Sequence, residues 1–140
     1  MTSGLANMTD LKQRYLKDAV DTASPAMRLT MLYDRLLLDL HRADQGFDAA
    51  DLKAVNDNLI HAQEIIIVLR STLREGRWEG ATRLCALYDY LHNELVMANL
   101  GKDRQRAADV RAHVVQLAQA WHAAADNVLM SSAEVAGGVA

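Results

Sequence analysis

The chain has 140 residues, a formal net charge of −3 at pH 7 and one cysteine, Cys85. This length suits a single domain with a buried core, and the mixed charges argue against a surface for nucleic acid. The longest apolar run, residues 65–69, is too short for a membrane span. One cysteine cannot close an internal disulfide, and residues 1–10 lack the pattern of a secretory signal, so we expect a cytoplasmic protein.

A short arm precedes the first long helix. Its apolar residues recur at helical spacing: Leu11, Tyr15, Leu16, Ala19 and Val20. This stripe cannot bury itself, so we expect residues 1–24 to lie on the rest of the chain, either as a permanent element or as a lid that a partner displaces. Ser24 and Pro25 mark the end of the arm, because serine caps free backbone N–H groups and proline fits the first helical turn.

Four amphipathic stripes follow the arm. In each stripe, apolar residues recur at alternating three- and four-residue steps, as at Leu32, Leu36 and Leu40. The expected helices cover residues 25–45, 51–73 (with 48 as an alternative start), 79–100 and 104–130. Gly46 and Gly101 are the expected stops of the first and third helices.

Short connections between four such stripes are typical of a helical bundle. We therefore predict an all-α fold, an antiparallel up-down four-helix bundle with a short N-terminal helical arm. The bundle is expected to cover residues 25–130. Residues 131–140 are mostly small or polar, and we expect them to form a flexible tail.

The helices carry more apolar residues than a bundle core requires. A bundle helix needs one apolar face, about three positions in seven. Taken singly, each extra residue has an ordinary interpretation as core or as incidental exposure, but a contiguous exposed patch indicates a partner surface. The pattern favours a groove that binds an amphipathic helix. The candidate partner-binding residues in the helices and the arm are Met31, Leu37, Leu38, Ile60, Ile65, Ile67, Val68, Tyr90, Met97, Tyr15, Leu16 and Val20.

Patterns typical of catalysis or metal binding are missing from the sequence. Metal-binding bundles use Glu-x-x-His pairs, whereas this chain has His61-x-x-Glu64 and Asp89-x-x-His92, which we interpret as solvated faces. No phosphate-binding or dinucleotide-binding glycine motif occurs. Cys85 has no evident activating base one turn away. We therefore expect neither enzymatic activity nor a cofactor or metal.

Several short motifs occur in a defined order: Thr22-Ala23-Ser24-Pro25, Met31-Leu32-Tyr33-Asp34, Leu87-Tyr88-Asp89-Tyr90, and Leu117 with Trp121. This order, over roughly residues 15–128, resembles the flagellar export chaperones of the FliS family. The resemblance implies a helical bundle that holds the disordered carboxy-terminal segment of flagellin in apolar grooves. Holding this segment would prevent premature polymerisation and keep the subunit ready for the flagellar export apparatus. The resemblance also implies that the arm gives way to the bound segment.

The chain departs from the family pattern near the start of the first helix. Arg35 stands where relatives commonly have glycine, and a bulky cation there would prevent a close backbone approach. Ala26 and Met27 replace the acidic residues usual after the cap proline, which removes some stabilisation by the helix dipole. Tyr33 and Tyr88 fall on or beside core seams, where we expect them to pack with hydrogen-bonded hydroxyls.

Two functions are compatible with these patterns. The first is a cytoplasmic export chaperone for flagellin, a monomer or weak homodimer that binds neither nucleic acid nor membrane. The alternative is a regulatory bundle that binds an amphipathic helix of another assembly or signalling factor. Both predict an exposed groove, but only the first requires selective binding to the carboxy-terminal segment of flagellin.

Overall fold

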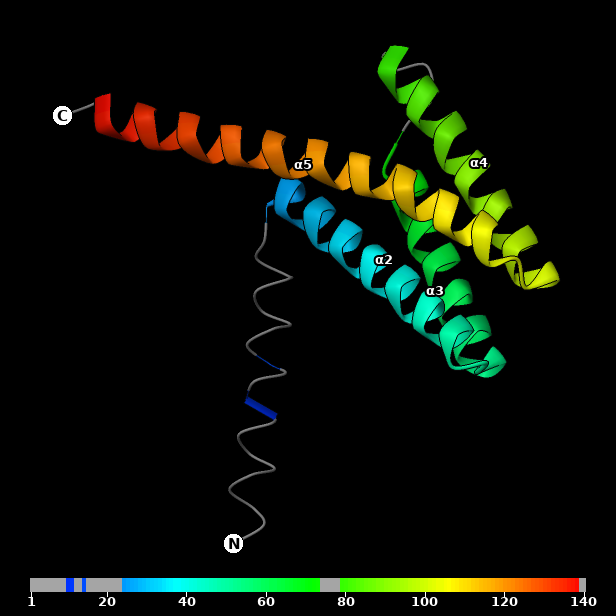
Figure 1. The fold of residues 1–140 in the computed structure, drawn as a ribbon. Coiled ribbons are helices and arrows are strands. Elements are labelled where there is room, and N and C mark those ends of the chain that lie inside the picture. The colour runs from blue at the N-terminus through cyan, green and yellow to red at the C-terminus, as the bar shows by residue number, and fades with distance from the viewer. Residues whose placement is uncertain (1–9, 12–13, 15–23, 74–78, 139–140) are drawn as a thin grey trace, which may run out of the picture.

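The computed structural model describes residues 10, 11, 14, 24–73 and 79–138, with residues 128–138 described as backbone only. The described residues form four long helices, α2 (Pro25–Asp48), α3 (Leu52–Ser71), α4 (Glu79–Gly101) and α5 (Arg104–Gly138). Consecutive helices run in opposite directions (Figure 1). α2 packs against α3 and α5, and α4 packs against the same two helices. The predicted antiparallel bundle is confirmed. The arm residues Tyr15, Leu16 and Val20 lie outside the described residues.

The helices begin where side chains cap them. The Ser24 hydroxyl accepts a hydrogen bond from the Met27 backbone N–H at 3.2 Å, with Pro25 at the first helical position, as predicted. Asp51 caps α3 in the same manner by accepting from the Ala54 backbone N–H at 3.1 Å. Each cap satisfies a donor that the helix itself leaves free.

The end of α2 differs from the prediction. Gly46 does not stop the helix, which continues to Asp48, and the left-handed residue of the turn is Ala50 with φ 52°. A Cβ atom on Gly46 would lie 3.0 Å from Val55 Cγ2 and 3.1 Å from the Val55 backbone nitrogen. Glycine is therefore needed at this position because α3 starts in close contact with α2, not because the helix ends there.

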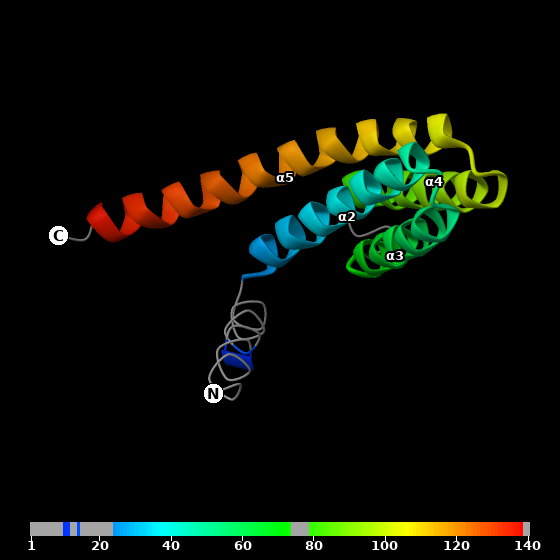
Figure 2. The same ribbon diagram turned by 60° about the horizontal axis from the view of Figure 1, so that its bottom comes forward.

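The last helix is longer than predicted. α5 continues to Gly138, so the expected boundary at residue 130 is wrong and residues 131–138 are helical. Its carboxy-terminal part projects beyond the other helices in both views (Figures 1 and 2). Gly101 is the final residue of α4 as predicted, but the left-handed position is taken by Lys102, with φ 47°.

The core lies along the bundle axis. Its largest fully buried apolar side chains are Tyr33, Leu36, Leu59, Ile66, Leu69, Tyr88, Leu91, Leu95, Val55, Val110 and Val114. Each buried aliphatic or aromatic side chain contributes about 1.5–3 kcal/mol of transfer free energy, so this core is the main source of stability. At the end of the bundle that holds the α2–α3 turn, Arg104 forms ion pairs with Asp44 and Asp48, each at 2.8 Å, and ties α5 to α2.

Candidate functional site

A groove lies between the first turns of α2 and the carboxy-terminal end of α3 with the two residues that follow it. These segments lie side by side because the two helices are antiparallel. The groove has a volume of about 480 Å³. We call it the α2–α3 groove, and its lining consists of Pro25, Arg28, Leu29, Leu32, Val68, Thr72 and Leu73. A mainly apolar hollow of this size is typical of sites that hold a ligand or a few side chains of a partner.

A second hollow, of about 180 Å³, lies between α2 and α5. It is smaller, and its lining includes the charged residues Asp44 and Arg111. Arg104, which ties α5 to α2, holds the pKa of Asp44 below its ordinary value of 3.8 mainly by donating a hydrogen bond to it. The carboxylate is therefore ionised at neutral pH, and this hollow suits an apolar partner less well than the α2–α3 groove does.

Most of the candidate residues on the helices are exposed. Met31 and Leu38 on α2, Ile60, Ile67 and Val68 on α3, and Tyr90 and Met97 on α4 have exposed fractions from 37% to 54%. Val68 also lines the α2–α3 groove. Leu37 is half-buried and packs against the core.

Ile65 is buried, and its expected exposure is wrong. Its side chain is 6% exposed and belongs to the core. Ile65 follows His61 by one helical turn, and His61 bonds to Asp39 of α2. This flank of α3 therefore faces α2, which covers it.

The sequence interpretation missed most of the groove lining. Leu29, Leu32 and Leu73 follow the seam spacing, and they are half-buried and pack against the core, but they also line the α2–α3 groove. They lie near helix ends, where a seam has fewer neighbouring side chains to cover it. The sequence did contain a signal for this groove: in an antiparallel pair, Leu29 and Leu32 near the start of one helix lie opposite Leu73 at the expected end of the next. Exposed large apolar residues beyond the candidate set are Leu11, Met27, Leu52, Leu100 and Val115.

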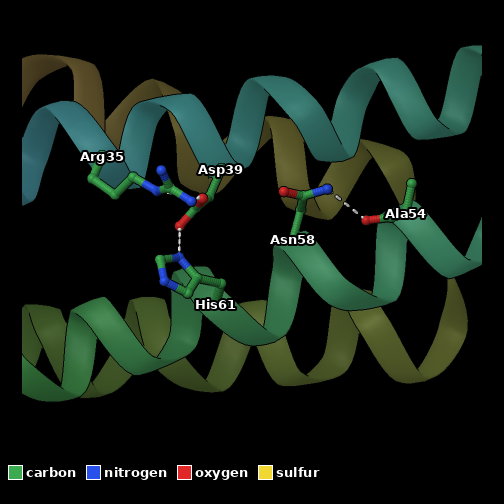
Figure 3. A network of polar contacts seen from close by, with 5 residues as sticks. All are labelled: Arg35, Asp39, Ala54, Asn58 and His61. Carbon is green, nitrogen blue, oxygen red and sulfur yellow. Dashed lines mark hydrogen bonds and ion pairs between the residues drawn. The ribbon is translucent and has the colours of Figure 1, made fainter. Parts of the chain in front are cut away.

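A polar network crosses the interface between α2 and α3 (Figure 3). Asp39 is fully buried, and its carboxylate accepts hydrogen bonds from Arg35 Nε at 3.2 Å and from His61 Nδ1. A buried carboxylate is costly unless it is paired in this manner. Arg35 therefore lies beside its partner Asp39 on α2, and His61, whose side chain is 44% exposed, bonds to Asp39 as well as facing solvent.

A second network joins α2, α4 and α5 in the core. The hydroxyls of Tyr33 and Tyr88 share a hydrogen bond, and Trp121 Nε1 donates to the Tyr33 hydroxyl at 3.1 Å. The rings of Tyr33 and Trp121 are stacked with centroids 6.4 Å apart. Burial raises the pKa of both tyrosines above 10.0 and keeps the hydroxyls neutral. The predicted packing of hydrogen-bonded tyrosines is confirmed.

The groove and both networks lie within the part of the chain that matches a known family. The family described as "Flagellar protein FliS" matches residues 7–128. The chain belongs to the FliS family. Relatives named "Flagellar secretion chaperone FliS" include those of Bacillus subtilis, 36% identical over 107 residues, and Salmonella typhimurium, 35% identical over 108 residues. Each alignment covers 76% of this chain and 80% of the relative.

A solved structure supports the FliS-family fold. It is described as a crystal structure of a flagellar chaperone from bacteria, and it superposes with a TM-score of 0.67. The match covers 85% of this chain and 98% of that chain at 16% sequence identity, so the likeness concerns the fold alone.

Two further observations apply to the described part of this FliS-family chain. None of its helices combines the length and the apolar character that crossing a membrane requires. No group of three or more histidine, cysteine, aspartate or glutamate residues gathers there in a manner that could hold a metal ion.

Proposed function

We propose that this FliS-family chain is a cytoplasmic export chaperone that binds the disordered carboxy-terminal segment of flagellin. Binding would prevent premature polymerisation and keep the subunit competent for secretion. Family membership supports the proposal, because the relatives are named flagellar secretion chaperones. The observation that carries it is the α2–α3 groove, an open and mainly apolar hollow of about 480 Å³.

The mechanism is capture of apolar side chains from an unfolded segment, and it involves no covalent step, cofactor or metal. The groove offers Leu29, Leu32, Val68 and Leu73 to such side chains. Burying three or four aliphatic side chains contributes about 5–10 kcal/mol, and ordering the segment costs at least about 2–5 kcal/mol. The difference suits binding that is firm but reversible, as handing a subunit to the export apparatus requires.

The exposed apolar residues beyond the groove extend the proposed surface. Met31, Leu38, Ile60, Ile67, Tyr90 and Met97 would contact further parts of the bound segment. Tyr15, Leu16 and Val20 belong to the arm, and their proposed role is to cover part of this surface until the client binds. Residues 1–24 are proposed as a lid that the client displaces. Ser24 directly precedes Pro25 in the groove lining, so the arm starts from the edge of the site.

The test compares full-length flagellin with flagellin that lacks its carboxy-terminal segment in a pull-down by the purified chain. We expect retention of the full-length protein only. A Val68→Asp variant should lose much of this retention, because the substitution places a charge in the groove. Val115→Asp is the matched control, since Val115 is exposed on α5 and does not line the groove. Equal retention of both flagellins would contradict the proposal and favour a regulatory bundle that binds another helix.

A further inference from the structure

Arg28 is the one charged residue in the described lining of the α2–α3 groove. It lines the groove beside Leu29 and Leu32, and no residue among the groove's described lining is acidic. Within the residues that the structure describes, the Arg28 side chain makes neither an ion pair nor a hydrogen bond. By contrast, Arg104 pairs with Asp44 at 2.8 Å and Arg106 with Glu94 at 3.1 Å.

We propose that the groove recognises a pair of neighbouring side chains in the bound segment, one large and apolar, the other an aspartate or glutamate. The apolar side chain would enter between Leu29, Leu32 and Val68, and the carboxylate would pair with Arg28. This inference rests on the proposed function and adds a rule for the segment that the chaperone accepts. In a helical segment, the two side chains would be three or four positions apart, where they lie on one face.

Charge complementarity carries the proposal. A guanidinium presents several donors in a planar fork that matches a carboxylate, and it keeps its charge at all physiological pH values. The apolar lining of the groove partly excludes water once a client is bound, which strengthens such a pair. The same cation would disfavour a segment with a lysine or arginine at that position. Arg28 would therefore set the register of the segment as well as contribute to its affinity.

We assign the carboxylate to a side chain and not to the free end of the client. Exposed apolar residues occur well beyond the groove on both helices, as at Leu38 and Ile60. A segment that covers them continues past Arg28, so its terminus need not lie in the groove.

The test titrates a labelled peptide of the carboxy-terminal flagellin segment into the full-length chain and its Arg28→Glu variant. We expect the variant to weaken binding by about threefold to tenfold, since an attraction becomes a repulsion at a partly exposed site. The loss should shrink as salt is added. Arg42→Glu is the matched control, because Arg42 is exposed on the same helix and lies outside the groove lining. Neither variant should unfold the chain, and α2 has no acidic residue in its first turn that would repel a glutamate at position 28.

Peptide variants then identify the partner. Each aspartate and glutamate of the peptide is replaced in turn by asparagine or glutamine, and one such replacement should weaken binding to the wild-type chain but not to Arg28→Glu. Amidation of the peptide's carboxy terminus should leave the effect of Arg28→Glu unchanged. The inference is overturned if Arg28→Glu and Arg42→Glu behave alike, if no acidic position depends on Arg28, or if amidation removes the difference.

The same titration separates the two proposals. If the wild-type chain does not bind the peptide, the proposed function and this inference both fail. If the peptide binds and Val68→Asp weakens it while Arg28→Glu does not, the groove is the site but the acidic partner is refuted.

Discussion

His61 on α3 donates a hydrogen bond to Asp39, a fully buried carboxylate on α2 (Figure 3). The contact joins two helices across their interface. Asp39 also accepts from Arg35, so each of its two oxygens has a donor. Because a buried carboxylate is costly when it loses a partner, this contact constrains how α2 and α3 pack.

We predict that His61→Ala destabilises the chain by about 1–3 kcal/mol, since one oxygen of Asp39 then lacks its donor inside the protein. The measurement is the free energy of unfolding in urea. His41→Ala is the control, because His41 is exposed and should change stability by less than about 0.5 kcal/mol. Equal stabilities of the two variants would show that water replaces the imidazole at no cost.

Gly46 and Gly101 should respond in opposite directions to alanine. In Gly46→Ala the new Cβ would meet both the side chain and the backbone of Val55, so we expect a loss of about 1–3 kcal/mol. In Gly101→Ala the new methyl group meets nothing within 4 Å. There we expect a gain of up to about 1 kcal/mol from reduced freedom of the unfolded chain. Thermal unfolding of both variants checks the pair, and a stabilising Gly46→Ala would contradict the close approach of α3.

Because Tyr33 and Tyr88 are buried, we predict that the free energy of unfolding falls at alkaline pH. Tyrosine ionises near pH 10.0 in an unfolded chain, whereas burial raises the pKa of Tyr33 and Tyr88 in the folded protein. Above that pH the unfolded state releases protons that the folded state retains, so stability should fall as the pH rises. Urea unfolding at about pH 8 and about pH 11 measures the change.

A double variant, Tyr33→Phe with Tyr88→Phe, tests the assignment. It should be less stable at both pH values, because the Trp121 donor loses its acceptor, but its alkaline loss should be smaller than that of the wild type. Tyr90→Phe is the control, since Tyr90 is exposed and should leave the alkaline loss unchanged. An undiminished loss in the double variant would assign the effect to other groups.

The helices were predictable from the sequence because their start signals are local. Ser24 with Pro25 and the cap at Asp51 depend on neighbouring residues, and the structure places helix starts at both. The end of α2 was not predictable, because Gly46 serves a contact with Val55, a residue of the next helix. A glycine that permits a close approach and a glycine that ends a helix look the same in one sequence.

The candidate site was predictable only in part. Helical spacing placed Ile60 and Ile67 on one flank of the seam and Val68 nearly opposite it, and all three are exposed. Spacing gave the wrong exposure for Ile65, which α2 covers, and it did not show that Leu32, which packs against the core as expected, also lines the groove. Both shortfalls have one origin: a helical wheel gives the direction of a side chain but not how far the neighbouring helix extends.

The arm offers a test of the proposed lid. We predict that deleting residues 1–20 leaves binding of the carboxy-terminal flagellin segment intact or strengthens it, because a displaced lid competes with the client. Titration of the deletion variant with the segment peptide measures this. Complete loss of binding would instead make Tyr15, Leu16 or Val20 direct contributors to the affinity.

Ile65 and Ile67 provide the sharpest separation of core from surface, since they are two positions apart on α3. Ile65 is 6% exposed and Ile67 is 54% exposed. We predict that Ile65→Asp destabilises the bundle by more than about 3 kcal/mol, because it buries an unpaired charge. Ile67→Asp should keep the wild-type helical circular dichroism signal and its unfolding midpoint.

The Ile67→Asp variant also tests how far the binding surface extends. Ile67→Asp should weaken binding of the flagellin segment by about tenfold, the equivalent of one lost apolar contact of about 1.4 kcal/mol. Leu100→Asp is a suitable control, because Leu100 is highly exposed on α4 and was not assigned to the surface. If Ile67→Asp unfolds the chain, position 67 is part of the core. If it folds and binds as the wild type does, the client does not reach this face of α3, and the α2–α3 groove defines the site without it.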